Sequence, residues 1–167
     1  MKRAVLALAV LLAGPSLPFA SAEGQEDVQI SRFSGKPVPR FETLRHETVN
    51  GRVGPSKDHK VQWEYKRRGL PVLILKESGD WRYVRDPQGD EVWIERTQLA
   101  AQQNAVAMAD FVLKAGRAPD SADVARISAG ALLELGTCDA SMCQVSADGF
   151  KGWAPRAQLW GATATKG

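Results

Sequence analysis

The sequence predicts an all-β protein made of two small β-barrels in tandem, which follow a cleaved signal peptide. Three observations support this prediction. Short alternating apolar segments are separated by turns that contain Gly and Pro, the pattern repeats after about 60 residues, and the N-terminus is basic and then apolar. The chain has 167 residues, enough for one domain or two small ones, and the repeat favours two.

Residues 1–22 are predicted to be the signal peptide. Lys2 and Arg3 precede about ten apolar residues and a small-residue cleavage site that ends at Ala22. The apolar segment is too short to cross a bilayer as a helix, although a retained N-terminal anchor is the alternative. Removing Lys2 and Arg3 lowers the formal net charge from +3 to +1, which leaves little attraction for nucleic acid. We therefore expect a periplasmic or secreted protein with no membrane span in its mature chain.

Changes in composition divide the mature chain. Residues 23–43 read as a flexible leader that ends in an arm with Pro37 and Pro39. This arm either lies over the first barrel or is a plain linker. The other predicted segments are the first barrel at 44–100, an Ala- and Gln-rich linker at 101–109, the second barrel at 110–162 and a tail at 163–167.

The strands of each barrel are expected where short apolar or alternating segments lie between turns. In the first copy these segments are 48–53, 61–65, 70–75, 81–84 and 92–94. In the second copy they are 111–114, 124–127, 131–135, 140–145 and 150–154.

The internal repeat is supported by the spacing of glycine, tryptophan and leucine. In each copy a glycine precedes a tryptophan by four residues, and a leucine follows that tryptophan by six. The residues concerned are Gly89, Trp93 and Leu99 in the first copy, and Gly149, Trp153 and Leu159 in the second. Agreement at several offsets indicates that one architecture occurs twice.

On these residues both copies resemble bacterial SH3-like domains, which are barrels of five to seven strands. The stretch 49–56 looks like the family's N-x-R-x-G-P-S start, and Trp81 and Trp93 follow its later pattern. The stretches 34–41 and 159–161 are similar to a subgroup of secreted alphaproteobacterial envelope proteins. The chain departs from the pattern at Gly51, where an apolar β-former is usual, and at Met142, which replaces the strand tryptophan of the second copy.

The resemblance implies a binding function. In secreted bacterial relatives the ligand is often a cell-wall (peptidoglycan) peptide or another envelope protein. We expect no enzyme, because no Gly-rich phosphate loop and no Ser-His-Asp candidate is recognisable. In some cell-wall hydrolases such modules lie beside a catalytic domain with a Cys nucleophile and a His base, for which we expect no length here. No cofactor is expected, and the oligomeric state is left open.

Cys138 and Cys143 are the only cysteines and are predicted to form a disulfide. They flank a predicted hairpin turn, where opposed Cβ atoms come close enough to bond. Closing so small a loop contributes about 2 kcal/mol on the chain-entropy model. A redox pair is the sharper alternative, but the C-x-x-C spacing is missing. A metal site is not expected, because His46 and His59 lie in the other copy.

The candidate ligand-binding residues are aromatic and belong to the first copy. Trp63 and Tyr65 share one strand face by period-two alternation, and Trp81 and Tyr83 share another. Exposed rings of this kind can recognise an extended peptide. The basic run 66–68 either favours an acidic ligand beside this groove or is a solvated turn. The alternative function is a structural or scaffolding protein of the envelope with no small-ligand groove.

Trp93 and its counterpart Trp153 are expected in the cores of the two barrels. Each lies between a turn glycine and an apolar residue. A barrel of about 55 residues also needs every large apolar side chain that it can bury.

Overall fold

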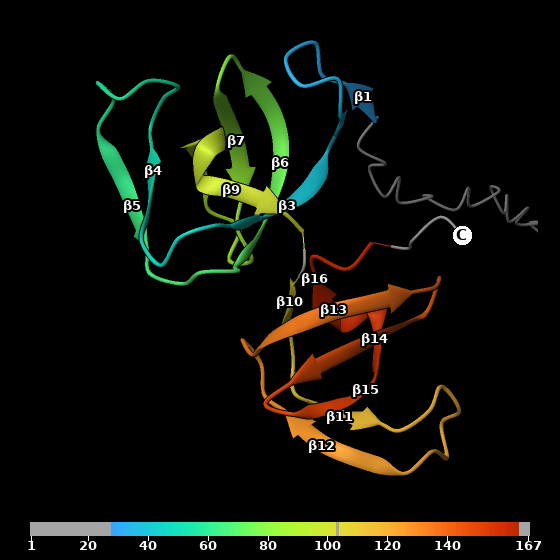
Figure 1. Cartoon of the computed structure of the whole chain (residues 1–167). Coiled ribbons are helices and arrows are strands. Elements are labelled where there is room, and N and C mark those ends of the chain that lie inside the picture. The colour runs from blue at the N-terminus through green and yellow to red at the C-terminus, as the bar shows by residue number, and fades with distance from the viewer. Residues whose placement is uncertain (1–27, 103, 164–167) are drawn as a thin grey trace, which may run out of the picture.

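The computed structural model describes residues 28–102 and 104–163, so the predicted signal peptide lies outside the described residues. Figure 1 shows two β-barrels stacked end to end, with the chain crossing from one to the other after β9. Each barrel contains one seven-stranded antiparallel sheet. The described part of the chain has no helix long and apolar enough to cross a membrane.

The first sheet has the strand order β5-β4-β8-β7-β6-β3-β9. Its strands, in chain order, are β3 (Arg40–Leu44), β4 (Val49–Arg52), β5 (Val61–Tyr65), β6 (Pro71–Ser78), β7 (Trp81–Arg85), β8 (Glu91–Glu95) and β9 (Leu99–Ala101). A 3-10 turn, η1 (Arg96–Gln98), connects β8 to β9. A separate two-stranded sheet, β1 (Gln29–Ile30) with β2 (Pro37–Val38), precedes this barrel.

The second sheet has the strand order β12-β11-β15-β14-β13-β10-β16, which matches the first sheet position by position. Its strands are β10 (Asn104–Ala107), β11 (Phe111–Lys114), β12 (Asp123–Ile127), β13 (Leu132–Cys138), β14 (Met142–Ala147), β15 (Phe150–Pro155) and β16 (Leu159–Trp160), with η2 (Arg156–Gln158) before the last. The all-β, tandem architecture predicted from the sequence is thus confirmed.

The stretch 101–109, expected as a linker, contains the strand β10. This strand pairs with both β13 and β16, and its residues Ala105, Val106 and Ala107 are buried. Small apolar side chains suit a strand that has a neighbour on each side. Alanine is uncommon in strands, however, so the composition of this stretch does not indicate one. In the same way β3 begins at Arg40, inside the stretch expected to be the leader.

Each barrel has an apolar core of its own. Large buried side chains of the first barrel include Leu44, Ile74 and Ile94, and those of the second include Leu113 and Leu133. The core also explains Gly51, because a Cβ atom there would lie 2.6 Å from Cγ2 of the buried Val92. The position that departs from the family pattern is therefore a close approach of β4 to the core.

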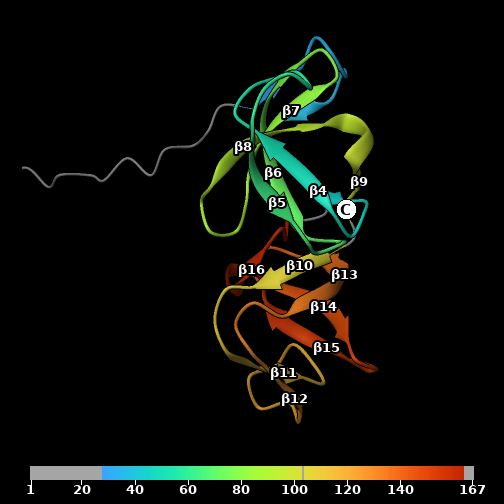
Figure 2. The same ribbon diagram turned by 90° about the vertical axis from the view of Figure 1, so that its left-hand side faces the viewer.

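The two barrels are packed against each other through Trp160. Its ring packs on the first barrel's core and meets the Phe41 ring edge-on, with centroids 5.2 Å apart. Its Nε1–H donates to the Pro71 carbonyl oxygen at 3.1 Å. Two further bonds cross the junction, from Asn104 Nδ2 to the Gly69 carbonyl and from Arg67 to the Gly130 carbonyl. Figure 2 shows β16 and β10 on the side of the second barrel that faces the first.

The arm before β3 lies against the first barrel and is fastened there by Glu77. Ser31 Oγ and Ser34 Oγ donate to the Glu77 carboxylate at 2.5 and 2.9 Å. Val38 is buried in the same core cluster as Leu44. Of the two readings that the sequence left open for this arm, the structure shows that it packs on the barrel.

The predicted disulfide is present at the β13–β14 hairpin. Cys138 and Cys143 are directly opposed partners, with Cα atoms 4.1 Å apart. In the first barrel the corresponding opposed partners on β6 and β7 are Glu77 and Arg82, again five residues apart. Their side chains form an ion pair of 3.2 Å. One hairpin position therefore carries a covalent link in one barrel and a charged link in the other.

Candidate ligand-binding surface

Three aromatic side chains lie on the outward face of the first sheet. On β7 and β8 the buried residues alternate with half-buried ones, and the half-buried set contains Trp81, Tyr83 and Trp93. Tyr83 is directly opposite Trp93 across the two strands, and their rings are 5.1 Å apart with an angle of 47°. We call these three residues the aromatic face.

Cationic side chains border the aromatic face. Lys76 Nζ lies 4.5 Å from the Tyr83 ring centre and 5.7 Å from that of Trp93, which is cation–π geometry. Arg52 is the direct partner of Trp93 on the neighbouring strand β4. Trp81 lines a recess of about 150 Å³ whose rim carries the Lys57–Glu95 ion pair. The surface therefore offers flat apolar rings beside polar groups, as peptide-binding grooves do.

Glu91 lies at the edge of this surface and interacts with both Tyr83 and Arg85. It accepts a hydrogen bond from Arg85 Nε at 2.9 Å and also interacts with the Tyr83 hydroxyl. The hydrogen bond with Tyr83 is the main reason why the pKa of Glu91 lies below its usual value. The same bond, together with burial, raises the pKa of Tyr83. The Tyr83 ring is thus held in place by its hydroxyl as well as by Trp93.

The four predicted ligand-binding residues do not form one group. Trp81 and Tyr83 share the outward face, as expected from their alternation. Trp63 and Tyr65 lie on β5 at the end of the strand order, opposite the buried Gly51 and Val49 of β4, with ring centres 6.5 Å apart. Trp63 is 49% exposed, whereas Tyr65 is only 5% exposed. Tyr65 thus offers no ring to a ligand, and Trp63 stands apart from the aromatic face.

Trp93 was expected in the core, and this expectation is wrong. Its strand neighbours Val92 and Ile94 are the buried ones, so Trp93 points outward beside Tyr83. Trp153 is likewise half-buried on β15, between the buried Gly152 and Ala154. The alternation along 91–95 is the sequence signal that places Trp93 on the outward face, whereas the nearby turn glycine carries no information about which face a side chain takes.

Tyr65 has a structural role at the β7–β8 turn. Its hydroxyl donates to Asp86 Oδ2 at 3.1 Å, and Asp86 Oδ1 accepts the backbone N–H groups of Gln88 and Asp90. Asp86 is only 1% exposed, so these donors replace the water that its carboxylate has lost. Burial is the main reason why the pKa of Tyr65 is raised far above its usual value, and the negative charge of Asp86 adds to this.

Replacing Tyr65 with phenylalanine should lower the free energy of unfolding by about 1–3 kcal/mol, because the buried Asp86 then lacks one donor. Urea denaturation of both proteins measures this difference. The other tyrosine supplies the matched control: Tyr83→Phe removes a hydroxyl from the partly exposed surface and should change stability by less than about 1 kcal/mol. Equal losses in the two variants would contradict the role given to the Asp86 turn.

The second barrel does not repeat the aromatic face. Met142 and Gln144 stand at the positions of Trp81 and Tyr83, as the pairing with β15 shows. Its remaining ring, Trp153, is covered by the Arg117 guanidinium, 4.2 Å from the ring centre. Arg67 of the basic run 66–68 is used at the junction of the barrels, where it donates to the Gly130 carbonyl oxygen.

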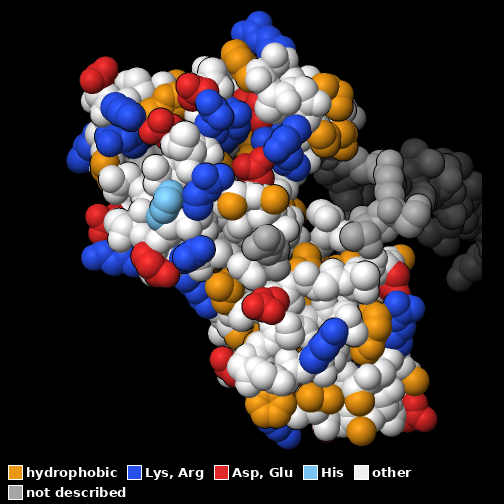
Figure 3. Space-filling view, viewed as in Figure 1, with side chains coloured by type: hydrophobic (Ala, Val, Ile, Leu, Met, Phe, Trp, Pro, Cys, Tyr) orange, Lys and Arg blue, Asp and Glu red, His pale blue; other side chains and the backbone are white. Residues whose placement is uncertain are grey.

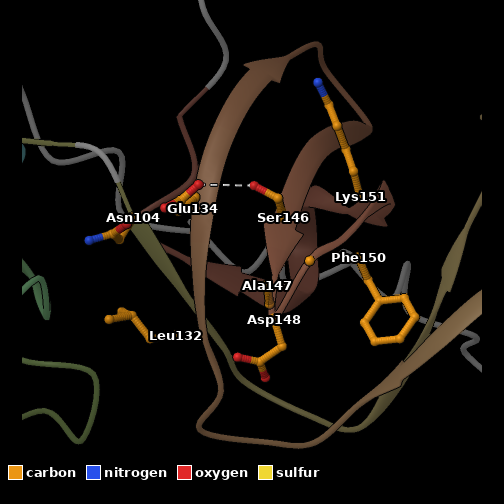
Figure 4. A pocket seen from close by; sticks show the side chains of 9 residues that line it. Asn104, Leu132, Glu134, Ser146, Ala147, Asp148, Phe150 and Lys151 are labelled. Carbon is orange, nitrogen blue, oxygen red and sulfur yellow. Dashed lines mark hydrogen bonds between the residues drawn. The ribbon is translucent and has the colours of Figure 1, made fainter.

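A hollow of about 510 Å³ is found in the second barrel, and Figure 4 shows its lining. None of the predicted ligand-binding residues lines it. Lys151 and Asp148 extend in opposite directions, and Glu134 is already bonded to Ser146 Oγ at 3.1 Å. Its polar groups therefore do not converge on one point as they do in a specific ligand site.

Comparison with protein-family models agrees with the fold. The family model described as bacterial SH3 domain matches residues 45–100 and 112–161. No curated protein matches the chain. Solved structures similar to the chain include NlpC2 and NlpC1 from Trichomonas vaginalis and an NlpC/P60 family protein from Bacillus cereus ATCC 10987.

These similarities are distant. NlpC2 is 11% identical over 72% of this chain and 47% of its own, with a TM-score of 0.34. NlpC1 is 13% identical over 78% and 48%, and the Bacillus protein 13% over 72% and 55%, both with TM-scores of 0.33. The chain spans about half the length of these structures. The family assignment rests on the family model, which matches most of the described residues in two separate segments. The chain belongs to the bacterial SH3 domain family and carries two copies of the domain.

Proposed function

We propose that the protein is a non-catalytic binding module of the cell envelope, which binds a peptide across the aromatic face of its first barrel. The ligand is a cell-wall peptide or an extended segment of an envelope protein, and the site of action is the periplasm. The observation that supports this proposal most is the aromatic face itself, which is partly exposed in the first barrel and missing from the second.

The junction between the barrels favours binding over a purely scaffolding role. A scaffold without a groove would be favoured if Trp81 and Tyr83 were buried between the barrels. The contact is instead made by Trp160 and Phe41. The junction therefore leaves the aromatic face free for a ligand, and Trp81 has a recess beside it for a ligand side chain.

The proposal is tested by mixing the mature protein with purified sacculi and with defined muropeptides. We expect the protein to sediment with sacculi and its tryptophan fluorescence to change saturably with a muropeptide. If neither occurs, cross-linking in the periplasm should capture an envelope protein through the first barrel. Failure of all three measurements would contradict a binding function.

A further inference from the structure

A second hollow, of about 480 Å³, lies between the N-terminal arm, β9 and the β6–β7 turn of the first barrel. Figure 3 shows Lys and Arg side chains gathered on this barrel, with acidic side chains between them. Five cationic residues line the hollow: Lys36, Arg40, Arg45, Arg82 and Arg96. It shares no residue with the aromatic face, so it is a separate feature of the molecule.

The cations of this hollow outnumber the carboxylates. Glu42 and Asp80 line it, and Glu77 lies behind Arg40 and Arg82. The five cations and these three carboxylates leave a formal charge of +2. The mature chain as a whole is predicted to carry only +1, so this positive charge is a local feature.

The hydrogen bonds show which cations are already occupied. Arg40 is fully engaged by Glu42, Glu77 and the Pro37 carbonyl. Arg96 uses its Nε on Asp80 at 2.6 Å, while its side chain remains 56% exposed. Arg45 is exposed, and among the described residues no ion pair involves its guanidinium, since only its backbone N–H is bonded, to the Gln98 carbonyl oxygen. The outer rim therefore presents guanidinium groups that are able to bind a further anion.

Arg82 supplies a positive charge in the wall of the hollow. Its side chain is 6% exposed, and its Nε contacts Glu77 at 3.2 Å. Its Nη1 donates to the carbonyl oxygens of Gly79 and Trp81. Burying such a charge is expensive unless it is paired and hydrogen-bonded. Glu77 and the two carbonyl oxygens supply these partners, so the Arg82 cation is held in a fixed position in the wall of the hollow.

The second barrel repeats only some of these charges: Arg96 has a counterpart in Arg156, which begins η2, whereas the positions of Arg82 and Arg45 differ. Its hairpin has the Cys138–Cys143 disulfide where the first barrel has Glu77 and Arg82. The position of Arg45 is occupied there by Met108, since the backbone N–H of each donates to the glutamine carbonyl of the neighbouring 3-10 turn. Arg82 therefore links its hairpin as the disulfide does in the second barrel, whereas Arg45 has no charged counterpart there. The same architecture forms without a cation at the position of Arg45, so the use of this charge must be sought outside folding.

We propose that this hollow binds the carboxylate of a ligand, with Arg45 and Arg96 as the direct contacts. A planar guanidinium donates two parallel hydrogen bonds to a carboxylate, which suits the two exposed arginines of the rim. A hollow of about 480 Å³ is within the range of small-ligand sites. The carboxylate belongs either to the C-terminus of a peptide or to an acidic side chain.

The test is a titration of the full mature chain with three probes. Binding is monitored through the NMR signals of the arginine Nε–H groups. The probes are N-acetyl-dialanine with a free carboxylate, its C-terminal amide, and N-acetyl-glutamic acid amide with only a side-chain carboxylate. We expect at least one of the two acids to shift the signals of Arg45 and Arg96, and the dialanine amide not to. Which acid binds more tightly identifies the source of the carboxylate.

The variants Arg45→Ala and Arg96→Ala should each weaken binding of that acid about tenfold, because a charge-assisted hydrogen bond is lost. Both side chains are exposed, so these variants are expected to fold. Arg126→Ala, which removes an exposed arginine from β12 of the second barrel, is the matched control and should bind as the unchanged protein does. Any of three results would overturn the proposal. These are that the dialanine amide binds as tightly as the acid, that neither acid binds, or that both rim variants bind as well as the unchanged protein.

Discussion

Replacing Trp160 with alanine is expected to destabilise the protein by about 3 kcal/mol and to affect the two barrels together. The ring is half-buried, so this value is at the lower end of the range for losing a large aromatic side chain. Trp160 belongs to the second barrel but packs on the core of the first, meets Phe41 and bonds to Pro71. Urea denaturation followed by fluorescence and by far-UV circular dichroism measures the loss.

The control for this variant is Trp63→Ala, which removes an exposed ring at the edge of the first barrel. It should change the free energy of unfolding by less than about 1 kcal/mol. If Trp160→Ala were as stable as this control, the junction would be only a surface contact. The two barrels would then unfold independently of one another.

The second large effect is expected from Glu77→Gln, which should cost about 3–5 kcal/mol. The Glu77 side chain is fully buried and pairs with Arg40 and Arg82, so its loss leaves the buried Arg82 without a counter-charge. It also weakens the attachment of the arm through Ser31 and Ser34. Glu134→Gln, at an exposed position of the second barrel, is the matched control and should have little effect.

A double variant tests whether this hairpin position needs a charged pair or only a link between its two strands. Glu77→Cys with Arg82→Cys copies the pair found at the same hairpin position of the second barrel. We expect this variant to regain most of the lost stability in oxidising buffer and to lose it again on reduction. No recovery after oxidation would show that the two hairpins are not interchangeable.

Lowering the pH should weaken the attachment of the N-terminal arm to Glu77. Burial raises the pKa of Glu77, but hydrogen bonds from Ser31, Arg40 and Ser34 outweigh it, and the pKa lies below its usual value of 4.5. A carboxyl with a lowered pKa in the folded state stabilises the protein above its unfolded pKa. This contribution is lost as the pH falls below about 4.5 and through the folded value. Unfolding free energies measured from pH 6 to pH 3 should therefore fall more steeply for the unchanged protein than for Glu77→Gln.

The sequence predicts the fold well because its strongest signals are local. Gly and Pro mark the turns, alternation marks the strands, and the repeated spacing around Trp93 and Trp153 shows the duplication. The disulfide was also predictable, since two cysteines that flank one hairpin turn are held opposite each other. The strand β10 was missed because half of its residues are alanine, which carries little strand signal.

The site was harder to predict because it depends on long-range packing. Alternation correctly places Trp63 and Tyr65 on one face. It does not show that Tyr65 is buried, with its hydroxyl bonded to Asp86. Glu77 and Arg82 read as exposed strand residues until the arm is seen to cover them. An alignment of the two copies by their hairpins places Glu77 and Arg82 opposite each other, at the positions where the second copy has its cysteines.

The central claim is that the aromatic face of the first barrel binds the ligand, and a fluorescence titration of two tryptophan variants tests it most directly. Trp81→Ala removes a ring of that face, whereas Trp63→Ala removes an equally large ring that stands apart from it. With a muropeptide or captured envelope peptide, we expect Trp63→Ala to bind as the unchanged protein does and Trp81→Ala to lose saturable binding. Full binding by Trp81→Ala, or loss of binding in Trp63→Ala alone, would contradict the claim.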